Sequence, residues 1–186
     1  MSVMIDIIGS FIIIGVVMLS IFGLSSNLNQ SAYNKSFSVV TQTNEVALAR
    51  MIEFDFNKIG YQVPVSTPAL LKARPDSIIF KAALTYGGSW STVTYYTGPT
   101  SELTRTKNPR DRYLYRIEDG KKIPANLGVT SLSFVYYNRD GFITSALDSI
   151  KSIRARFTIE SPEPVDTSYS GISWEKRIYP KNLEIR

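Results

Sequence analysis

Residues 7–24 of this 186-residue chain read IIGSFIIIGVVMLSIFGL and contain no charged side chain. A helix rises about 1.5 Å per residue, so about 18 apolar residues suffice to cross most of a hydrocarbon core about 30 Å thick. The neighbouring residues 3–5 and 25–28 extend this reach. The stretch therefore predicts a transmembrane helix at the N-terminus, with residues 1–28 as the membrane anchor.

Two other interpretations of the apolar stretch remain open. A secretory signal peptide begins with basic residues and ends in a small-residue cleavage site. Here Asp6 is the only charged side chain before the stretch, the first basic residue is Lys35, and no cleavage site stands out after Leu24. A buried core helix of a soluble protein that is apolar on every side needs a large protein around it, and about 160 residues follow. The residues favour a membrane anchor.

Composition restricts the chemistry that the chain can perform. Cysteine and histidine are both absent, which removes disulfides, thiol chemistry, the commonest general base and the commonest transition-metal ligand. The sequence contains no glycine-rich phosphate-binding loop. We therefore predict that the chain is not an enzyme and that it holds no cofactor and no metal. The formal net charge of +5 suits either an anionic partner or a well-solvated surface.

The helical pattern continues beyond the anchor. Residues 25–59 contain neither proline nor glycine, and apolar residues recur at intervals of three and four. That stripe is predicted to comprise Leu28, Ala32, Val39 or Val40, Thr43, Val46 or Ala47, Arg50 or Met51, and Phe54. Gly60 is placed to end the helix in a left-handed cap, and Pro64 follows. The pattern predicts one helix over residues 4–59, with its distal half, residues 29–59, packed on a folded domain.

Beyond the helix the pattern changes to short runs of alternating apolar and polar residues. Six runs are predicted to be strands, at residues 77–84, 91–97, 112–117, 130–137, 150–160 and 172–179. Turn residues such as Asp119-Gly120 and residues 138–141 separate them. Asn138 and Asp140 also match the middle of a calcium loop, but the closing glutamate is missing, so a turn is favoured. We predict an α+β fold: a long N-terminal helix packed on an antiparallel sheet within residues 75–186, the whole domain covering residues 29–186.

Three segments resemble the type IV pilin and type II secretion pseudopilin family, most closely its larger minor pilins and J-type minor pseudopilins. Residues 50–61, RMIEFDFNKIGY, are similar to the end of the first helix in that family. Residues 128–141, GVTSLSFVYYNRDG, are similar to an aromatic strand that runs into a polar turn. Residues 179–183, YPKNL, are similar to the closing strand. The resemblance implies an anchor helix that later packs among the helices of neighbouring subunits in a filament.

The N-terminus departs from the family pattern in two respects. The family is cleaved after a glycine that follows a basic leader, and the mature chain has glutamate at its fifth position. Here there is no basic leader, Ile14 is the fifth residue after Gly9, and Asp6 becomes the fifth residue if Met1 is removed. The resemblance implies that Asp6 meets the amino terminus of a neighbouring subunit. The alternative is that Asp6 lies at the membrane surface.

Small residues in the anchor are further candidates for helix contacts. Glycine lets membrane helices approach closely, although glycine is also simply frequent in such helices. The candidate assembly residues of the anchor are Asp6, Gly9, Phe11 and Gly15.

The most basic part of the chain lies around residues 98–111, a polar loop that we expect to be mobile. A possible binding patch for an anionic ligand consists of Arg105, Lys107, Arg110 and Arg112, with Arg116, Lys121 and Lys122 nearby. Tyr113 and Tyr115 are interleaved, as in surfaces that follow a nucleic acid or a polysaccharide. The plain alternative is a solvated loop.

These observations predict a structural subunit, of the minor class, in a pilin-like or pseudopilin-like envelope assembly. Its partners are the lipid bilayer and other pilin-like subunits, which it contacts through the N-terminal helix. The expected location is the cytoplasmic membrane, crossed once, with the C-terminal domain extracytoplasmic or in an extracellular filament. The distribution of Lys and Arg does not decide this orientation, which follows from the resemblance. The main alternative is a membrane-anchored extracytoplasmic module that binds an anionic polymer or wall glycan, and a tethered enzyme is the weaker one.

Overall fold

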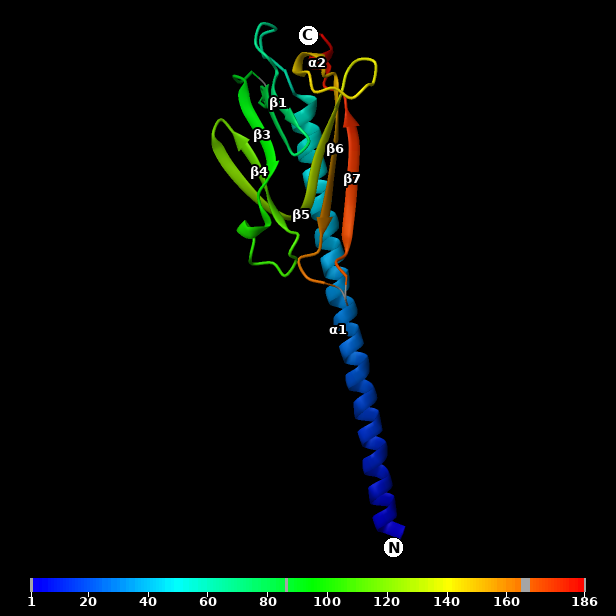
Figure 1. Cartoon of the computed structure of the whole chain (residues 1–186). Coiled ribbons are helices and arrows are strands. Elements are labelled where there is room, and N and C mark those ends of the chain that lie inside the picture. Colours follow the sequence, from blue (N-terminus) through cyan, green and yellow to red (C-terminus); the bar gives the residue numbers. More distant parts are fainter. Residues whose placement is uncertain (1, 86, 165–167, 186) are drawn as a thin grey trace. The chain divides into compact units, whose positions relative to one another are not determined.

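A computed structural model describes residues 2–85, 87–164 and 168–185 of the chain (Figure 1). The chain divides into two compact units, residues 1–38 and 39–186. Helix α1 (Ser2–Asn57) begins in the first unit and ends in the second, where it joins a seven-stranded sheet.

The first unit contains the apolar part of α1 and the more polar residues 25–38 that follow it. Every large hydrophobic side chain from Val3 to Leu24 is at least 50% exposed. The hydroxyl groups of Ser10 and Ser20 donate to the carbonyls of Asp6 and Val16, one turn earlier, at 2.8 and 2.9 Å. The helix therefore satisfies these polar groups internally, and by length and composition it is able to cross a membrane.

In the second unit, α1 contributes one face to the core of the domain. Leu48, Ile52 and Phe56 are fully buried, and their spacing of four places them on one side of the helix. The apolar stripe predicted from the sequence is wrong in this part of the helix, since Val39, Val40, Val46 and Phe54 are exposed and lie on other faces. Both faces carry apolar residues at helical spacing, and packing against the sheet decides which face is buried.

The helix ends two residues before the predicted Ile59, in a turn that closes at Gly60. The amide of Ile59 donates to the carbonyl of Phe56 at 3.2 Å. Gly60 has φ of +78°, the left-handed conformation expected of a C-terminal cap. Its amide donates to the carbonyl of Lys81 at 2.8 Å, so the end of the helix is tied directly to the sheet.

All seven strands pair antiparallel in sequence order, which confirms the predicted sheet. They are β1 (Leu70–Arg74), β2 (Ser77–Ala82), β3 (Ser91–Thr97), β4 (Arg112–Glu118), β5 (Lys121–Tyr137), β6 (Ser152–Glu160) and β7 (Gly171–Ile178). The sheet begins at Leu70, earlier than the predicted residue 75. Strand β1 was not predicted because a bulge between Leu70 and Lys72 interrupts the alternation of its side chains. Short helical turns η1 (Thr100–Glu102) and η2 (Leu147–Ser149) and helix α2 (Lys181–Glu184) complete the domain.

Strand β5 bends at Gly128 and so belongs to both halves of the sheet. Its first part pairs with β4 and its last part pairs with β6. Gly128 has φ of +75°, and a Cβ there would lie 2.5 Å from the carbonyl oxygen of Glu160. The amide of Phe134 donates to the carbonyl of Pro75 at 2.8 Å, so the turn between β1 and β2 returns to β5 and the sheet curls.

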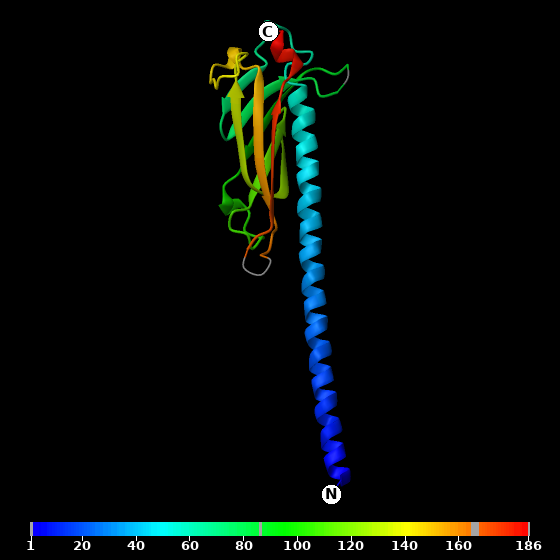
Figure 2. The ribbon, with the colours of Figure 1, turned by 90° about the vertical axis from the view of Figure 1, so that its right-hand side faces the viewer.

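The concave side of the curled sheet holds an aromatic core. The ring of Phe56 from α1 lies 5.6 to 5.7 Å from those of Phe80, Tyr95 and Phe134. In the turned view, residues 39–57 of α1 lie along one face of the strands (Figure 2). The predicted α+β fold, with the distal half of a long N-terminal helix on an antiparallel sheet, is confirmed.

Candidate functional site

The four candidate assembly residues lie on α1 in the first unit. At about 100° per residue, Asp6 and Gly9 lie about 60° apart, and Phe11 and Gly15 lie about 40° apart on a different face. Phe11 is 71% exposed. No described atom comes within 4 Å of a Cβ built on Gly9 or Gly15, beyond the immediate helix backbone. No close contact in the described part of the chain therefore requires these two glycines.

Asp6 and Phe11 border one shallow hollow on the surface of α1. Between them lies a strip of apolar side chains that also includes the hydroxyl of Ser10. The hollow is lined by Val3, Asp6, Ile7, Ser10, Phe11 and Ile14. Gly9 and Gly15 flank this strip and do not line it. Among the described residues Asp6 forms no ion pair, so its carboxylate is available to a partner from outside the chain.

A buried polar cluster fixes the distal part of α1 to the sheet, and sequence analysis did not identify it. Asp55 is 2% exposed, and its Oδ2 accepts from the hydroxyl of Tyr95 at 2.6 Å and from Nε of Arg116 at 2.7 Å. Nη1 of Arg116 donates to Glu118 at 2.8 Å. We refer to Asp55, Tyr95, Arg116 and Glu118 as the helix clamp.

The environment of the helix clamp keeps its donors protonated. Burial, followed by the charge of Asp55, raises the pKa of Tyr95 well above its usual value. Burial alone lowers the pKa of Arg116, but the hydrogen bonds to Asp55 and Glu118 outweigh it and raise the pKa further above the usual range. Tyr95 and Arg116 therefore remain donors at any ordinary pH.

Further contacts hold the same part of the helix. Glu53 forms an ion pair with Lys176 of β7 at 2.8 Å, and the ammonium of Lys58 donates to the carbonyl of Leu84. Nδ2 of Asn44 donates to the carbonyl of Leu127 at 3.2 Å. Contacts to β5, to β7 and to the segment after β2 thus fix the position of residues 44–58 on the domain.

The basic residues predicted as one patch have different partners and do not form one patch. Lys107 lies 3.1 Å from Glu163, and Arg110 lies 2.9 Å from Glu160. Arg112 donates from Nη1 to the carbonyl of Gly98 at 3.3 Å, and Arg105 is exposed. Arg110 and Arg112 line a common open hollow, which Arg105 and Lys107 do not border. Two of the four predicted residues are therefore brought together.

The loop that carries these residues is attached to the sheet at Asn108. The side chain of Asn108 is 1% exposed and donates to the carboxylate of Glu160 at 2.9 Å and to the carbonyl of Ser161 at 3.2 Å. Asp111 is also buried, and no hydrogen-bond partner reaches either of its carboxylate oxygens within the described residues. Burial raises the pKa of the Asp111 carboxyl; the nearby hydroxyl of Thr106 opposes this rise, and the charge of Glu160 adds to it.

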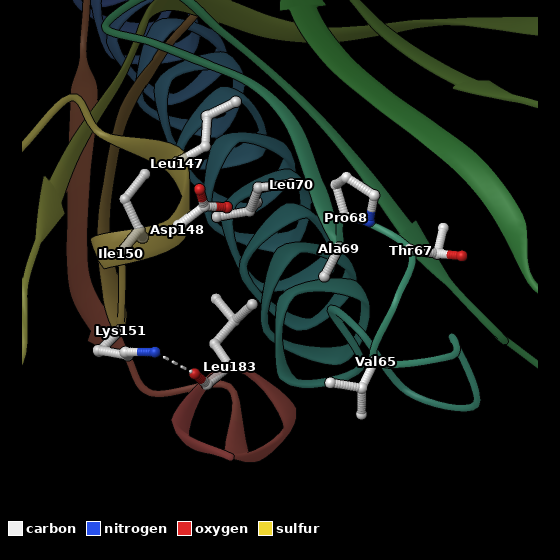
Figure 3. Close-up of a pocket in the computed structure, with 10 residues that line it drawn as sticks. All are labelled: Val65, Thr67, Pro68, Ala69, Leu70, Leu147, Asp148, Ile150, Lys151 and Leu183. Carbon is white, nitrogen blue, oxygen red and sulfur yellow. Dashed lines mark hydrogen bonds between the residues drawn. The ribbon is translucent and has the colours of Figure 1, made fainter. Parts of the chain in front are cut away.

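A pocket of about 230 Å³ lies between the segment after α1, η2 and α2 (Figure 3). Its lining is mainly apolar and consists of Val65, Thr67, Pro68, Ala69, Leu70, Leu147, Asp148, Ile150, Lys151 and Leu183. The ammonium of Lys151 points to the carbonyl of Leu183 and donates to it at 2.9 Å, as the dashed line shows. Asp148 is exposed. The pocket thus offers one solvated carboxylate and one ammonium already bound to the backbone, which is a poor set for acid–base chemistry.

Comparison with models of known protein families gives no match, and a search of curated proteins finds no matching sequence.

Proposed function

We propose that the chain is a structural subunit of a pilin-like or pseudopilin-like envelope assembly, of the minor class, and that it assembles through the first unit of α1. The sheet domain is extracytoplasmic and the helix is anchored in the cytoplasmic membrane. The observation that carries this proposal is the exposed apolar surface of residues 3–24, on a helix whose distal part is built into the core of a folded domain.

Assembly exchanges one apolar environment for another. In the bilayer, residues 3–24 contact lipid, and in the assembly they contact helices of neighbouring subunits. Lipid tails are as apolar as leucine, so close packing and polar contacts have to favour association between such helices. Gly9 and Gly15 allow close approach, and Asp6 is a carboxylate whose cost at a membrane falls when a neighbouring cation pairs with it.

The helix clamp has a defined role in this proposal. A subunit drawn from the bilayer by its helix is loaded at the junction of helix and domain. The contacts of Asp55 with Tyr95 and Arg116 resist sliding of the helix along the sheet, because sliding leaves a buried charge without its partner.

Photo-crosslinking in native membranes tests the proposal. Phe11 is replaced by p-benzoylphenylalanine, which keeps an aromatic ring at an exposed position, and the matched control carries the same probe at Tyr179 in the sheet domain. We expect the probe at position 11 to give covalent adducts with other proteins that have an apolar N-terminal helix. Asp6→Ala should weaken these adducts without releasing the chain from the membrane.

Two outcomes contradict different parts of the proposal. If alkaline carbonate releases the protein from membranes, the anchor is wrong. If the chain stays in the membrane but the probe at position 11 reacts with lipid alone, the chain is a monomeric anchored protein and the assembly role is wrong.

A further inference from the structure

The outer face of the sheet carries an ordered group of arginine side chains. On β6 the residues that point away from the core are Arg154, Arg156, Thr158 and Glu160, and they alternate with fully buried apolar residues. The inner face is filled by α1, whereas the outer face of β5, β6 and β7 is mainly polar, with Val135 and Tyr137 of β5 as its apolar members. This face lies outside the basic loop that the sequence singled out.

The strand register aligns the outer residues in rows across the sheet. Arg154 lies directly opposite Arg177 of β7, and Arg156 lies opposite Glu175. Two positively charged side chains directly opposite each other destabilise a sheet. The pair of Arg154 and Arg177 therefore costs stability, which the ring of Tyr137 offsets in part, since its centre also lies 5.6 Å from the guanidinium of Arg154.

Arg177 is held in one orientation by its neighbours. Its guanidinium lies 4.0 Å from the ring centre of Tyr137 and 5.2 Å from that of Tyr179. Its Nε donates to the hydroxyl of Ser152 at 2.9 Å. A guanidinium has five N–H donors and this bond uses one, so the others remain to contact a ligand at little further entropic cost.

Glu175 supplies a carboxylate on this face, but it does not pair closely with the arginines around it. Glu175 lies 3.7 Å from Arg154 and 3.9 Å from Arg156, which is long compared with about 2.7–2.9 Å for a well-formed charged hydrogen bond. Arg154 and Arg156 thus share one distant carboxylate, and Arg177 forms no ion pair within the described residues. A ligand carboxylate or phosphate can form the short, bidentate contacts that Glu175 does not.

Hydroxyl groups continue the face toward a second basic site. Thr158 lies opposite Ser131 and Ser173, and the hydroxyls of Thr158 and Ser173 are 2.9 Å apart. Thr158 and Ser131 also line the open hollow that holds Arg110 and Arg112. The hollow is lined by Thr100, Pro109, Arg110, Arg112, Thr130, Ser131, Thr158 and Glu160. Guanidinium groups therefore lie at both ends of a hydroxyl-rich strip.

We propose that this surface binds a linear anionic polysaccharide. We name it the arginine face, defined by Arg154, Arg156 and Arg177 together with the hydroxyl strip of Ser131, Thr158 and Ser173. The arginines pair with carboxylate or phosphate groups along the polymer, and the hydroxyls, which both donate and accept, bind sugar hydroxyls.

The chemistry of the face favours a glycan over a nucleic acid. Single-stranded nucleic acids bind on successive exposed aromatic rings that stack with the bases. On the arginine face, Tyr137 is 9% exposed beneath Arg177, so Tyr179 is the exposed aromatic ring beside these arginines in the described part of the chain. The site is independent of how α1 assembles, and its test is separate from that of the assembly proposal.

The full-length protein in detergent is titrated with four polymers: polygalacturonate, phosphomannan, neutral dextran and poly(dT). We expect binding to at least one of the two acidic glycans, none to dextran, and weaker binding to poly(dT). Arg154→Ser with Arg156→Ser should reduce affinity for the acidic glycan about tenfold or more, since each lost charged hydrogen bond is substantial. The slope of log affinity against log salt should fall by about two.

The matched control is Arg105→Ser with Lys121→Ser, which removes the same charge from exposed positions elsewhere in the domain. It should change the affinity by less than about twofold, and retained melting temperatures establish that both variants are folded. The proposal is overturned if neither acidic glycan binds, if dextran binds as well, or if poly(dT) binds more tightly than both glycans. Equal loss in the two double variants also overturns it, because that result is nonspecific attraction to net charge.

Discussion

Replacing Asp55 by alanine is expected to destabilise the sheet domain by about 2–4 kcal/mol, because it removes the acceptor of the buried Tyr95 hydroxyl and one of the two carboxylates that pair with Arg116, leaving Glu118 as the other. The side chain of Arg116 is 15% exposed, and the Nε that donates to Asp55 loses its acceptor in this variant. The hydroxyl of Tyr95 also loses its acceptor inside the core. The effect is large compared with a typical total stability of about 5–15 kcal/mol.

Two companion variants separate the charge from the hydrogen bond. Tyr95→Phe removes the hydroxyl and leaves the ion pair, so it should cost about 1–2 kcal/mol. Asp55→Ala combined with Arg116→Met removes both charges and should be less destabilising than the sum of the single changes by at least about 1 kcal/mol. This comparison stays informative if Asp55→Ala alone is too unstable to purify.

Urea unfolding of the full chain in detergent measures these differences. The fluorescence of Trp174, which stacks on Phe157 at 5.0 Å, reports on the core. The control is Asp140→Ala, which removes an exposed turn carboxylate and should stay within about 0.5 kcal/mol of the parent protein. An Asp55→Ala variant as stable as the control, or strict additivity with Arg116→Met, would refute the helix clamp.

Three further changes test the sheet and its loop. Gly128→Ala places a Cβ 2.5 Å from a carbonyl oxygen of β6, at a residue with positive φ, and should lower the free energy of unfolding by more than about 2 kcal/mol in the same urea assay. Gly141→Ala is the control: its φ is also positive but its Cβ enters open space, so the loss should be about 1–2 kcal/mol. Phe56→Ala should lower the free energy of unfolding by about 3–5 kcal/mol and the exposed Phe54→Ala by less than about 1 kcal/mol; equal losses would contradict the core assignment. Asp111→Asn should raise the melting temperature near neutral pH. The pKa of the Asp111 carboxyl is higher in the folded than in the unfolded protein, so the ionised carboxylate destabilises the fold once the pH exceeds the usual carboxyl pKa of 3.8. That gain should shrink as the pH falls toward 3.8, and a gain that does not change with pH would contradict the assigned cause.

Local sequence pattern was sufficient for much of the fold. The helix cap at Gly60 and the alternation on β6 both follow from one segment read alone. The first part of β5 was not predicted, because residues 121–129 contain proline and glycine and do not alternate. Its strand conformation depends on pairing with β4. The buried stripe of α1 was misassigned for the same reason, since only the sheet selects one of two apolar faces.

The candidate sites were harder to predict because their partners are distant in sequence. Asp55 and Arg116 are 61 residues apart, and no local pattern links a helix carboxylate to a strand guanidinium. Lys107 and Arg110 looked like a free basic cluster until folding brought Glu163 and Glu160 beside them. The alternation over residues 150–160 predicted a strand, but only the register with β7 shows that the outward arginines of β6 lie beside Arg177.

The chemistry of the sheet also bears on what covers the N-terminal helix. In the second unit, α1 buries one face and leaves Phe54 55% exposed, as expected of a helix on a domain surface. Residues 3–24 are apolar on every side and need a cover on every side. Within the described residues the inner face of the sheet is already filled by Leu48, Ile52 and Phe56, and the outer face of β5 to β7 presents arginine, serine and threonine. Under the proposed function, lipid in the membrane or other apolar helices in an assembly supply this cover.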